Sequence, residues 1–166
     1  WPVVFDLTSL YPSIVRWLNM SPETMISEPL GGVELVDDVL AGRIRPEDYI
    51  SEHPDACFAI NGAMFDKSEE GIIARAMSFV FYERKRYKDL MKIEKNKLEA
   101  MRADRRDSEA IREQENAVGM LDAKQLAIKV VANGGYGAVG NIGFRYFRPA
   151  ISEAITVTGQ YIIRHT

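Results

Sequence analysis

A carboxylate followed by a tight turn is the first candidate for chemistry in this sequence. Residues 2–5 form a short apolar run that ends at Asp6, and residues 6–14 read Asp-Leu-Thr-Ser-Leu-Tyr-Pro-Ser-Ile. An Asp at the end of a buried strand can bind a hard cation such as Mg²⁺. The turn after it exposes backbone N–H groups just before a short helix, an arrangement that binds anions. The segment suits a metal–triphosphate complex, and a plain strand, turn and helix with a capping Asp is the alternative interpretation.

Basic and polar residues at helical spacing form a second candidate group. Arg84 and Lys88 are four residues apart, so they share one face of a helix. Lys129 and Asn133 show the same spacing, and Tyr136 follows seven residues after Lys129. Two cationic faces on paired helices would bind a polyanion such as a triphosphate.

Positive charge is concentrated around the first of these pairs. Residues 84–106 hold ten Lys and Arg against four Asp and Glu, a net charge of +6, whereas the whole chain has −3 and the remaining residues therefore have −9. Most of these charges also fit a solvated helix face with ion pairs at i,i+4 spacing. The net negative charge argues against a general nucleic-acid coat protein but allows a local basic site.

The order and spacing of these motifs resemble those of family B DNA polymerases over nearly the whole chain. Residues 6–14 resemble the first polymerase motif. Its form with Thr before Ser, continued by Ser-Pro-Glu-Thr at residues 21–24, is most similar to the replicative polymerases of T-even-type phages. Residues 129–137 resemble the second motif, Lys-x-x-x-Asn-Ser-x-Tyr-Gly, and Arg84 with Lys88 resembles the basic pair on the opposing finger helix.

The resemblance implies a DNA-directed DNA polymerase, in which a primer 3′-hydroxyl attacks the α-phosphate of a dNTP with the help of two Mg²⁺ ions. By motif, Asp6 would bind both metal ions and the Leu7 carbonyl would bind one. The residues implied in dNTP binding are Ser9, Leu10 and Tyr11 through backbone N–H groups, and Arg84, Lys88, Lys129 and Asn133 through side chains. Lys129 would also be the general acid at the pyrophosphate leaving group.

The same resemblance implies contacts with DNA and with the sugar. Tyr136 and Gly137 would line the nascent base pair near the minor groove. The Tyr11 ring would pack under the deoxyribose, and a simple core position is the alternative for this residue. The implied partners are primer-template DNA, the dNTP, the remainder of the polymerase chain and a sliding clamp bound through other regions.

The family's second catalytic carboxylates come from an Asp-Thr-Asp hairpin after the second motif, and this chain contains no Asp-x-Asp sequence. Asp37-Asp38 precedes the basic helices, so we interpret it as surface. The chain starts without Met and ends within a helical pattern, so we expect an excerpt of a longer protein that is inactive by itself. The alternative function is a non-catalytic helical-hairpin module that binds a protein or nucleic acid.

Local signals in the N-terminal half predict the elements that would position the first motif. Pro12 favours a short helix over residues 13–18. Ser21-Pro22-Glu23 indicates a second helix start, with Ser as the cap. The Asn61-Gly62 pair predicts a β-hairpin between residues 57–60 and residues 63–65.

The second half of the chain predicts a long helical hairpin. No Pro or Gly occurs between Ile72 and Arg106, and Asp107-Ser108 would cap a second helix over roughly residues 109–131. Gly134 and Gly135 replace the Ser and the larger residue usual in the family, and we expect them to end that helix early.

A strand and a final helix are expected after the hairpin. The strand covers residues 144–147, and the helix follows Pro149 with Ile151, Ile155 and Ile162 on one face.

These elements define an α+β fold with three parts. The resemblance implies a partial palm with short mixed strands at residues 1–70, an antiparallel two-helix fingers hairpin at residues 71–140, and a return to the palm at residues 141–166. No run approaches the ~18 apolar residues of a membrane span. The single cysteine, Cys57, suits a cytoplasmic protein.

Overall fold

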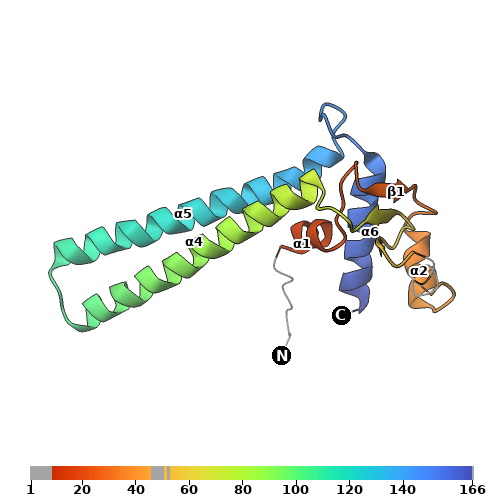
Figure 1. The fold of residues 1–166 in the computed structure, drawn as a ribbon. Coiled ribbons are helices and arrows are strands. Elements are labelled where there is room, and N and C mark those ends of the chain that lie inside the picture. Colours follow the sequence, from red (N-terminus) through yellow and green to blue (C-terminus); the bar gives the residue numbers. More distant parts are fainter. Residues whose placement is uncertain (1–8, 46–50, 52, 166) are drawn as a thin grey trace. The chain divides into compact units, whose positions relative to one another are not determined.

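The computed structural model describes residues 9–45, 51 and 53–165 (Figure 1). The described chain forms two compact units. The first comprises the residues up to Ser78 and those from Asn133 onward, and the second comprises Phe79–Ala132. The predicted strand at residues 2–5, with Asp6 and Leu7, lies outside the described residues.

The described elements are mostly helical, with one small sheet, so the α+β class is confirmed. The helices are α1 Leu10–Trp17, α2 Glu34–Leu40, α4 Ile72–Ala103, α5 Ser108–Val139 and α6 Pro149–His165, and the strands are β1 Met25–Ser27, β2 Ala56–Phe58 and β3 Met64–Asp66.

The sheet confirms the predicted β-hairpin and adds a third strand. Its order is β1-β3-β2, and both pairings are antiparallel. In the turn, Gly62 has a φ of +87°, and its N–H donates to the Ala59 carbonyl at 2.9 Å. A Cβ at Gly62 would lie 2.6 Å from Leu30 Cγ, so both the conformation and the close approach require glycine.

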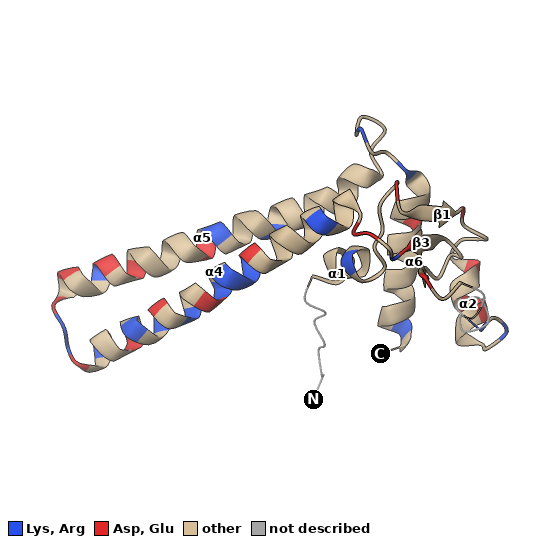
Figure 2. Ribbon diagram, in the orientation of Figure 1, with Lys and Arg blue, Asp and Glu red and all other residues tan. Residues whose placement is uncertain are grey.

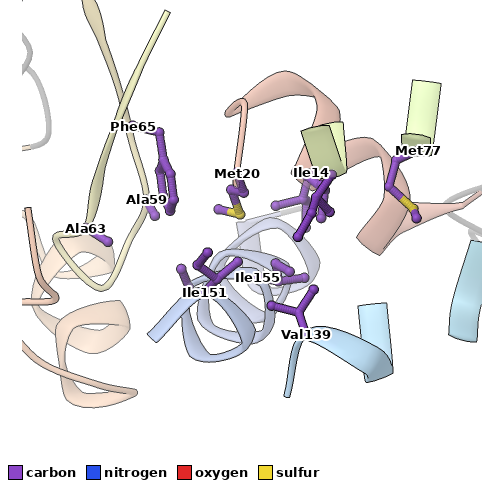
Figure 3. Close-up of a cluster of buried hydrophobic side chains, with 12 residues drawn as sticks. Ile14, Met20, Ala59, Ala63, Phe65, Met77, Val139, Ile151 and Ile155 are labelled. Carbon is purple, nitrogen blue, oxygen red and sulfur yellow. The ribbon is translucent and has the colours of Figure 1, made fainter. Parts of the chain in front are cut away.

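The core of the first unit is built around α6. Ile151 and Ile155 are fully buried, as their spacing predicts, and Ile162 packs against the same cluster. Ile14 from α1 and Phe65 from β3 are also buried in it (Figure 3). Burying a side chain of this size stabilises the folded state by roughly 1.5–3 kcal/mol.

The predicted helix start at Ser21-Pro22-Glu23 is wrong, because these residues cap a different helix. Residues 22–24 form a turn that leads into β1. The N–H groups of residues 71, 72 and 73 donate to Asn19 Oδ1 at 2.8 Å, to Glu23 Oε1, and to Ser21 Oγ at 3.2 Å. Burial opposes ionisation of Glu23, but hydrogen bonds from Ile72 N–H and Ser21 outweigh it and lower its pKa. Ser21 and Glu23 therefore do act as capping residues, but they cap α4 and not a helix that begins at residue 21.

Asn19 links the end of α1 to the segment that leads into α4. Its Nδ2 donates to the carbonyls of Asp66 and Glu69, both at 2.7 Å, while its Oδ1 accepts from Gly71 N–H. The side chain is 9% exposed, and its φ of +52° is left-handed, which Asn tolerates better than most residues.

We expect Asn19→Ala to lower the free energy of unfolding by about 2 kcal/mol or more, because three hydrogen bonds are lost, one of them buried and two partly buried. Urea denaturation of the chain measures the change. Asn19→Gly also loses these hydrogen bonds, but glycine adopts the left-handed backbone without strain. It should therefore lower the free energy of unfolding less than Asn19→Ala does. Asn96→Ala, at an exposed position of α4, is the matched control and should change stability little. An Asn19→Ala chain as stable as that control would contradict the linking role.

The second unit is an antiparallel pair of helices, as predicted (Figure 1). Gln114 Nε2 on α5 donates to the carbonyl and to Oε2 of Glu94 on α4, at 3.0 and 2.7 Å. Nearer the tip, Arg102 pairs with Glu115 at 2.7 Å. These contacts hold two long helices together with few buried apolar side chains in the unit.

The expected early end of the second long helix is wrong, since α5 continues through Gly134 and Gly135 to Val139. A glycine costs roughly 1 kcal/mol in a helix relative to Ala. Packing opposes this cost, because Val139 is buried in the core of the first unit and Tyr136 packs against that core. The local preference of two residues is overridden by contacts further along the same helix.

The predicted strand at residues 144–147 is also wrong. The segment consists of turns and bends, with Phe144 N–H donating to the Asn141 carbonyl and Arg148 N–H to the Val139 carbonyl. Phe144 and Tyr146 contact each other edge to face at 5.7 Å and pack against the core. The aromatic side chains of this segment therefore pack against the core from a loop and not from a strand.

Candidate functional site

The turn before α1 places backbone amides at a helix start. Ser9 has φ 59° and ψ 42°, and α1 begins at Leu10, earlier than the predicted start at residue 13. Ser13 N–H donates to the Ser9 carbonyl at 2.9 Å and is the first intrahelical donor. The amides of Leu10 and Tyr11 precede it, in the position where helix starts bind anions.

Two tyrosines from the two motif segments meet in the first unit. The rings of Tyr11 on α1 and Tyr136 on α5 stack with centroids 4.7 Å apart and planes 22° apart. Both side chains are partly buried, so Tyr11 is neither a fully buried core residue nor a free surface residue. The structure thus brings together two residues that are far apart in the sequence.

Helix α6 contacts both rings of this pair. Tyr136 Oη lies 3.0 Å from Thr156 Oγ1. One turn further on, a Cβ at Gly159 would lie 2.9 Å from Tyr11 Cε1. Any residue larger than glycine at position 159 would therefore push against the Tyr11 ring.

The two glycines that depart from the family motif have different surroundings. A Cβ at Gly135 would lie 2.4 Å from Met77 Cε, so a larger residue there requires Met77 to move. Gly134 is exposed, and a Cβ there would meet no atom of the described residues within 4 Å. The same is true of Gly137, next to Tyr136. Of these three positions, only position 135 has a packing reason for glycine, which is the contact with Met77.

The basic residues of the motifs lie in the second unit. Arg84 is partly buried, and its Nε donates to Gln125 Oε1 on α5 at 3.4 Å, a long hydrogen bond. Lys88 follows Arg84 by one turn on α4, and Lys129 follows Gln125 by one turn on α5. Because the helices are antiparallel, Lys88 and Lys129 lie on opposite sides of the Arg84–Gln125 contact along the pair, and Lys129 is about one turn from Arg84.

Lys88 and Lys129 differ from much of the charged surface around them. Both are exposed, and within the described residues neither has an ion pair or a side-chain hydrogen bond. Arg86, Lys97 and Arg102 instead pair with acidic side chains at 3.0, 2.6 and 2.7 Å. Figure 2 shows these alternating charges along α4 and α5. The ion-pair interpretation thus explains part of the positive segment and leaves Lys88 and Lys129 available to an anion.

The remaining predicted residues are distributed as follows. Asn133 is exposed on α5 and belongs to the first unit, as do Ser9, Leu10, Tyr11, Tyr136 and Gly137. The second unit contains Arg84, Lys88 and Lys129. Asp6 and Leu7, the predicted metal ligands, lie outside the described residues.

Other acidic residues do not form a metal site in the part of the chain that is described. No group of three or more His, Cys, Asp or Glu side chains is arranged there to hold an ion. Asp37 and Asp38 pair with Arg164 and Arg43, each at 2.6 Å, which agrees with their interpretation as surface. No helix within residues 9–45 and 53–165 is long and apolar enough to cross a membrane.

Sequence reasoning missed Thr156 and Gly159. Gly159 is the single glycine inside α6, and a glycine within a helical pattern often marks a close approach. Thr156 carried no such signal, because its partner is twenty residues earlier in the chain.

Sequence comparison finds polymerases as relatives. The chain is 33% identical to the DNA-directed DNA polymerase of Enterobacteria phage T4, over 94% of this chain and 20% of that protein. It is 30% identical to the DNA-directed DNA polymerase of Escherichia phage RB69, over 96% of this chain and 21% of that protein. The chain therefore spans about a fifth of the length of these relatives.

Fold and family comparisons agree with this result. The structure of the family B DNA polymerase from the archaeon Pyrobaculum calidifontis matches 96% of this chain and 16% of that one, with a TM-score of 0.61 at 23% identity. The sequence model described as DNA polymerase family B matches residues 2–118 and 101–166. The two polymerase motifs, the stacked tyrosines that join them and these matches lead to one conclusion: the chain belongs to DNA polymerase family B.

Proposed function

We propose that this chain supplies part of the polymerase site of a DNA-directed DNA polymerase that binds primer-template DNA and a dNTP. The observation that carries the proposal is the stack of Tyr11 on Tyr136, which joins the first and second motif segments within one unit. In this proposal residues 1–70 and 141–166 belong to the palm, and residues 71–140 are the fingers hairpin. A sliding clamp would bind through other regions of the polymerase.

The triphosphate would be bound by two kinds of donor. The backbone N–H groups of Ser9, Leu10 and Tyr11 lie at the start of α1, and this location supports their role as an anion cradle. The side chains of Arg84, Lys88, Lys129 and Asn133 would contact the outer phosphates. Lys88 and Lys129 have no ion pair among the residues that the structure describes, which supports this role because a phosphate can then bind without breaking such a pair.

Asp6 would bind both Mg²⁺ ions, and the Leu7 carbonyl would bind one of them. Bound Mg²⁺ ions would neutralise charge on the attacking and leaving oxygens. The further carboxylates would come from the remainder of the polymerase chain. Lys129 would hold a proton at its Nζ for the pyrophosphate leaving group, as a general acid.

The Tyr11 ring would exclude a ribose 2′-hydroxyl by steric clash. In the complete polymerase, Tyr11→Ala is therefore expected to raise ribonucleotide incorporation relative to deoxyribonucleotide incorporation. One to two orders of magnitude is a rough expectation, equivalent to about 1.4–2.7 kcal/mol of discrimination. Single-nucleotide primer extension with matched NTP and dNTP measures the ratio.

Tyr11→Phe is the matched control, because it keeps the ring and its stack on Tyr136 and should retain discrimination. Unchanged discrimination in a folded Tyr11→Ala enzyme would remove the sugar-sensing role. A complete wild-type chain that binds DNA or protein but never extends a primer would instead favour the non-catalytic hairpin module.

A further inference from the structure

We propose that a row of lysines along α4 binds the phosphate backbone of single-stranded template DNA. The lysine row consists of Lys85, Lys88, Lys92 and Lys95, all exposed and all within the second unit. The identity of the strand as template rests on the proposed function, whereas the surface itself rests on described residues of one helix.

The spacing of the four lysines places them on one face of α4. They follow one another at intervals of three, four and three residues, which keeps side chains on the same side of a helix. At ~100° per residue they lie within an arc of about 80°, and at a rise of ~1.5 Å per residue the row is about 15 Å long. The lysine row is therefore continuous along the helix axis.

The lysine row is not neutralised by neighbouring carboxylates. Arg86 and Lys97, on the same stretch of α4, pair with Glu83 and Glu94 at 3.0 and 2.6 Å. None of the four lysines has an ion pair among the residues that the structure describes. Of the two carboxylates between residues 85 and 95, Glu94 is paired in this way and Asp89 lies at the edge of the row, so the row keeps a net positive charge.

The other side of α4 has different surface chemistry. Helical spacing places Arg86 and Lys97 there, together with the exposed apolar side chains of Phe79, Leu90 and Ile93. The paired cations and the exposed apolar side chains thus share one side, and the unpaired lysines share the other. This separation gives the lysine side a positive potential that favours an anionic partner.

The lysine row extends further than a triphosphate site requires. Arg84, Lys88 and Lys129, the cations assigned to the dNTP, lie within about one turn of the contact between Arg84 and α5. Lys92 and Lys95 follow Lys88 by about one and two further turns, toward the tip of the hairpin. These two lysines therefore suit a longer polyanion, whose successive phosphates can contact successive side chains.

Single-stranded template is the polyanion that the proposed reaction supplies. The template is unpaired ahead of the nascent base pair, and a flexible single strand can follow a straight row of lysines on a helix. Proteins bind such strands through positively charged surfaces that track the backbone without reading the sequence. We therefore expect binding that is independent of sequence and falls steeply with salt concentration.

A double variant, Lys92→Gln with Lys95→Gln, tests the lysine row in the complete polymerase, because glutamine stays polar and removes both charges. Fluorescence anisotropy measures the affinity for a primer-template with a single-stranded oligothymidine overhang and for the same duplex with blunt ends, at about 50–200 mM salt. For the overhang, the slope of log K against log salt should become shallower by about 1.4, which corresponds to two lost single-strand contacts, and binding should weaken by roughly tenfold or more at the lowest salt. The affinity for the blunt duplex should not change.

The matched control is Arg86→Gln with Lys97→Gln, which removes the same charge from the other side of the same helix. It should leave the slope for the overhang nearly unchanged. Equal slope changes in the two double variants would overturn the proposal, because only net charge would then matter. Equal losses for the overhang and the blunt duplex would overturn it as well.

Two further results separate this proposal from the proposed function. A higher KM for dNTP at saturating primer-template, with unchanged DNA affinity, would assign Lys92 and Lys95 to the triphosphate and overturn the template assignment. If the proposed function itself fails, the wild-type chain extends no primer, while binding of the overhang still depends on Lys92 and Lys95.

Discussion

Lys129→Ala in the complete polymerase is expected to lower kcat/KM for the correct dNTP by about 100-fold or more. The lost group is an exposed ammonium, without an ion pair in the described part of the chain, that would contact the triphosphate and donate a proton to the leaving pyrophosphate. Single-turnover kinetics with saturating primer-template measures the change. A fall in the rate as well as in the affinity is expected, because the leaving group gains charge in the transition state.

The controls separate a specific contact from diffuse positive charge. Lys95→Ala removes an exposed cation from the same positive segment, away from the proposed triphosphate contacts, and should change kcat/KM little. Lys88→Ala should act in the direction of Lys129→Ala. Arg84→Ala should do so too, although it also removes the contact with Gln125. Similar losses at Lys95 and Lys129 would show that only overall charge matters.

Residues 1–166 alone are expected to extend no primer, even with Mg²⁺, dNTP and primer-template DNA present. Two divalent ions held close together repel each other, and carboxylates from more than one segment are needed to hold them. The chain offers Asp6 from the first motif and contains no Asp-x-Asp sequence. A gel assay of primer extension, on a chain shown to be folded by circular dichroism, tests this.

Asp6→Ala distinguishes the outcomes of that assay. In the complete polymerase it should abolish extension, while in the isolated chain both forms should be equally inactive. Extension by the isolated chain that depends on Asp6 would mean that a second carboxylate in these residues completes the site. Weak binding of a Mg²⁺–triphosphate complex is compatible with inactivity, because the basic residues are present.

The sequence by itself determined the elements whose cause is local. The run without Pro or Gly from Ile72 to Arg106 became α4, and the Asn61-Gly62 pair became the hairpin turn. The spacing of Ile151 and Ile155 placed the buried face of α6. In each case the deciding interactions lie within a few residues, so periodicity and turn chemistry are sufficient. The motif order also identified the family, which the comparisons confirmed.

Only the tertiary structure decided the features that depend on distant partners. Ser21 caps α4 through the N–H of Ile73, 52 residues away, so a correct capping signal was assigned to the wrong helix. Gly134 and Gly135 stay helical because Val139, beyond them, is buried in the core.

The stack of Tyr11 on Tyr136 at the candidate site also depends on distant partners, so the sequence alone did not predict it. Sequence motifs singled out Tyr11 and Tyr136, but their stack and its support by Thr156 and Gly159 join segments that have no local relation. Hydrogen-bond direction and close approach are properties of side chains that meet only after the chain has folded, so no local pattern could reveal them.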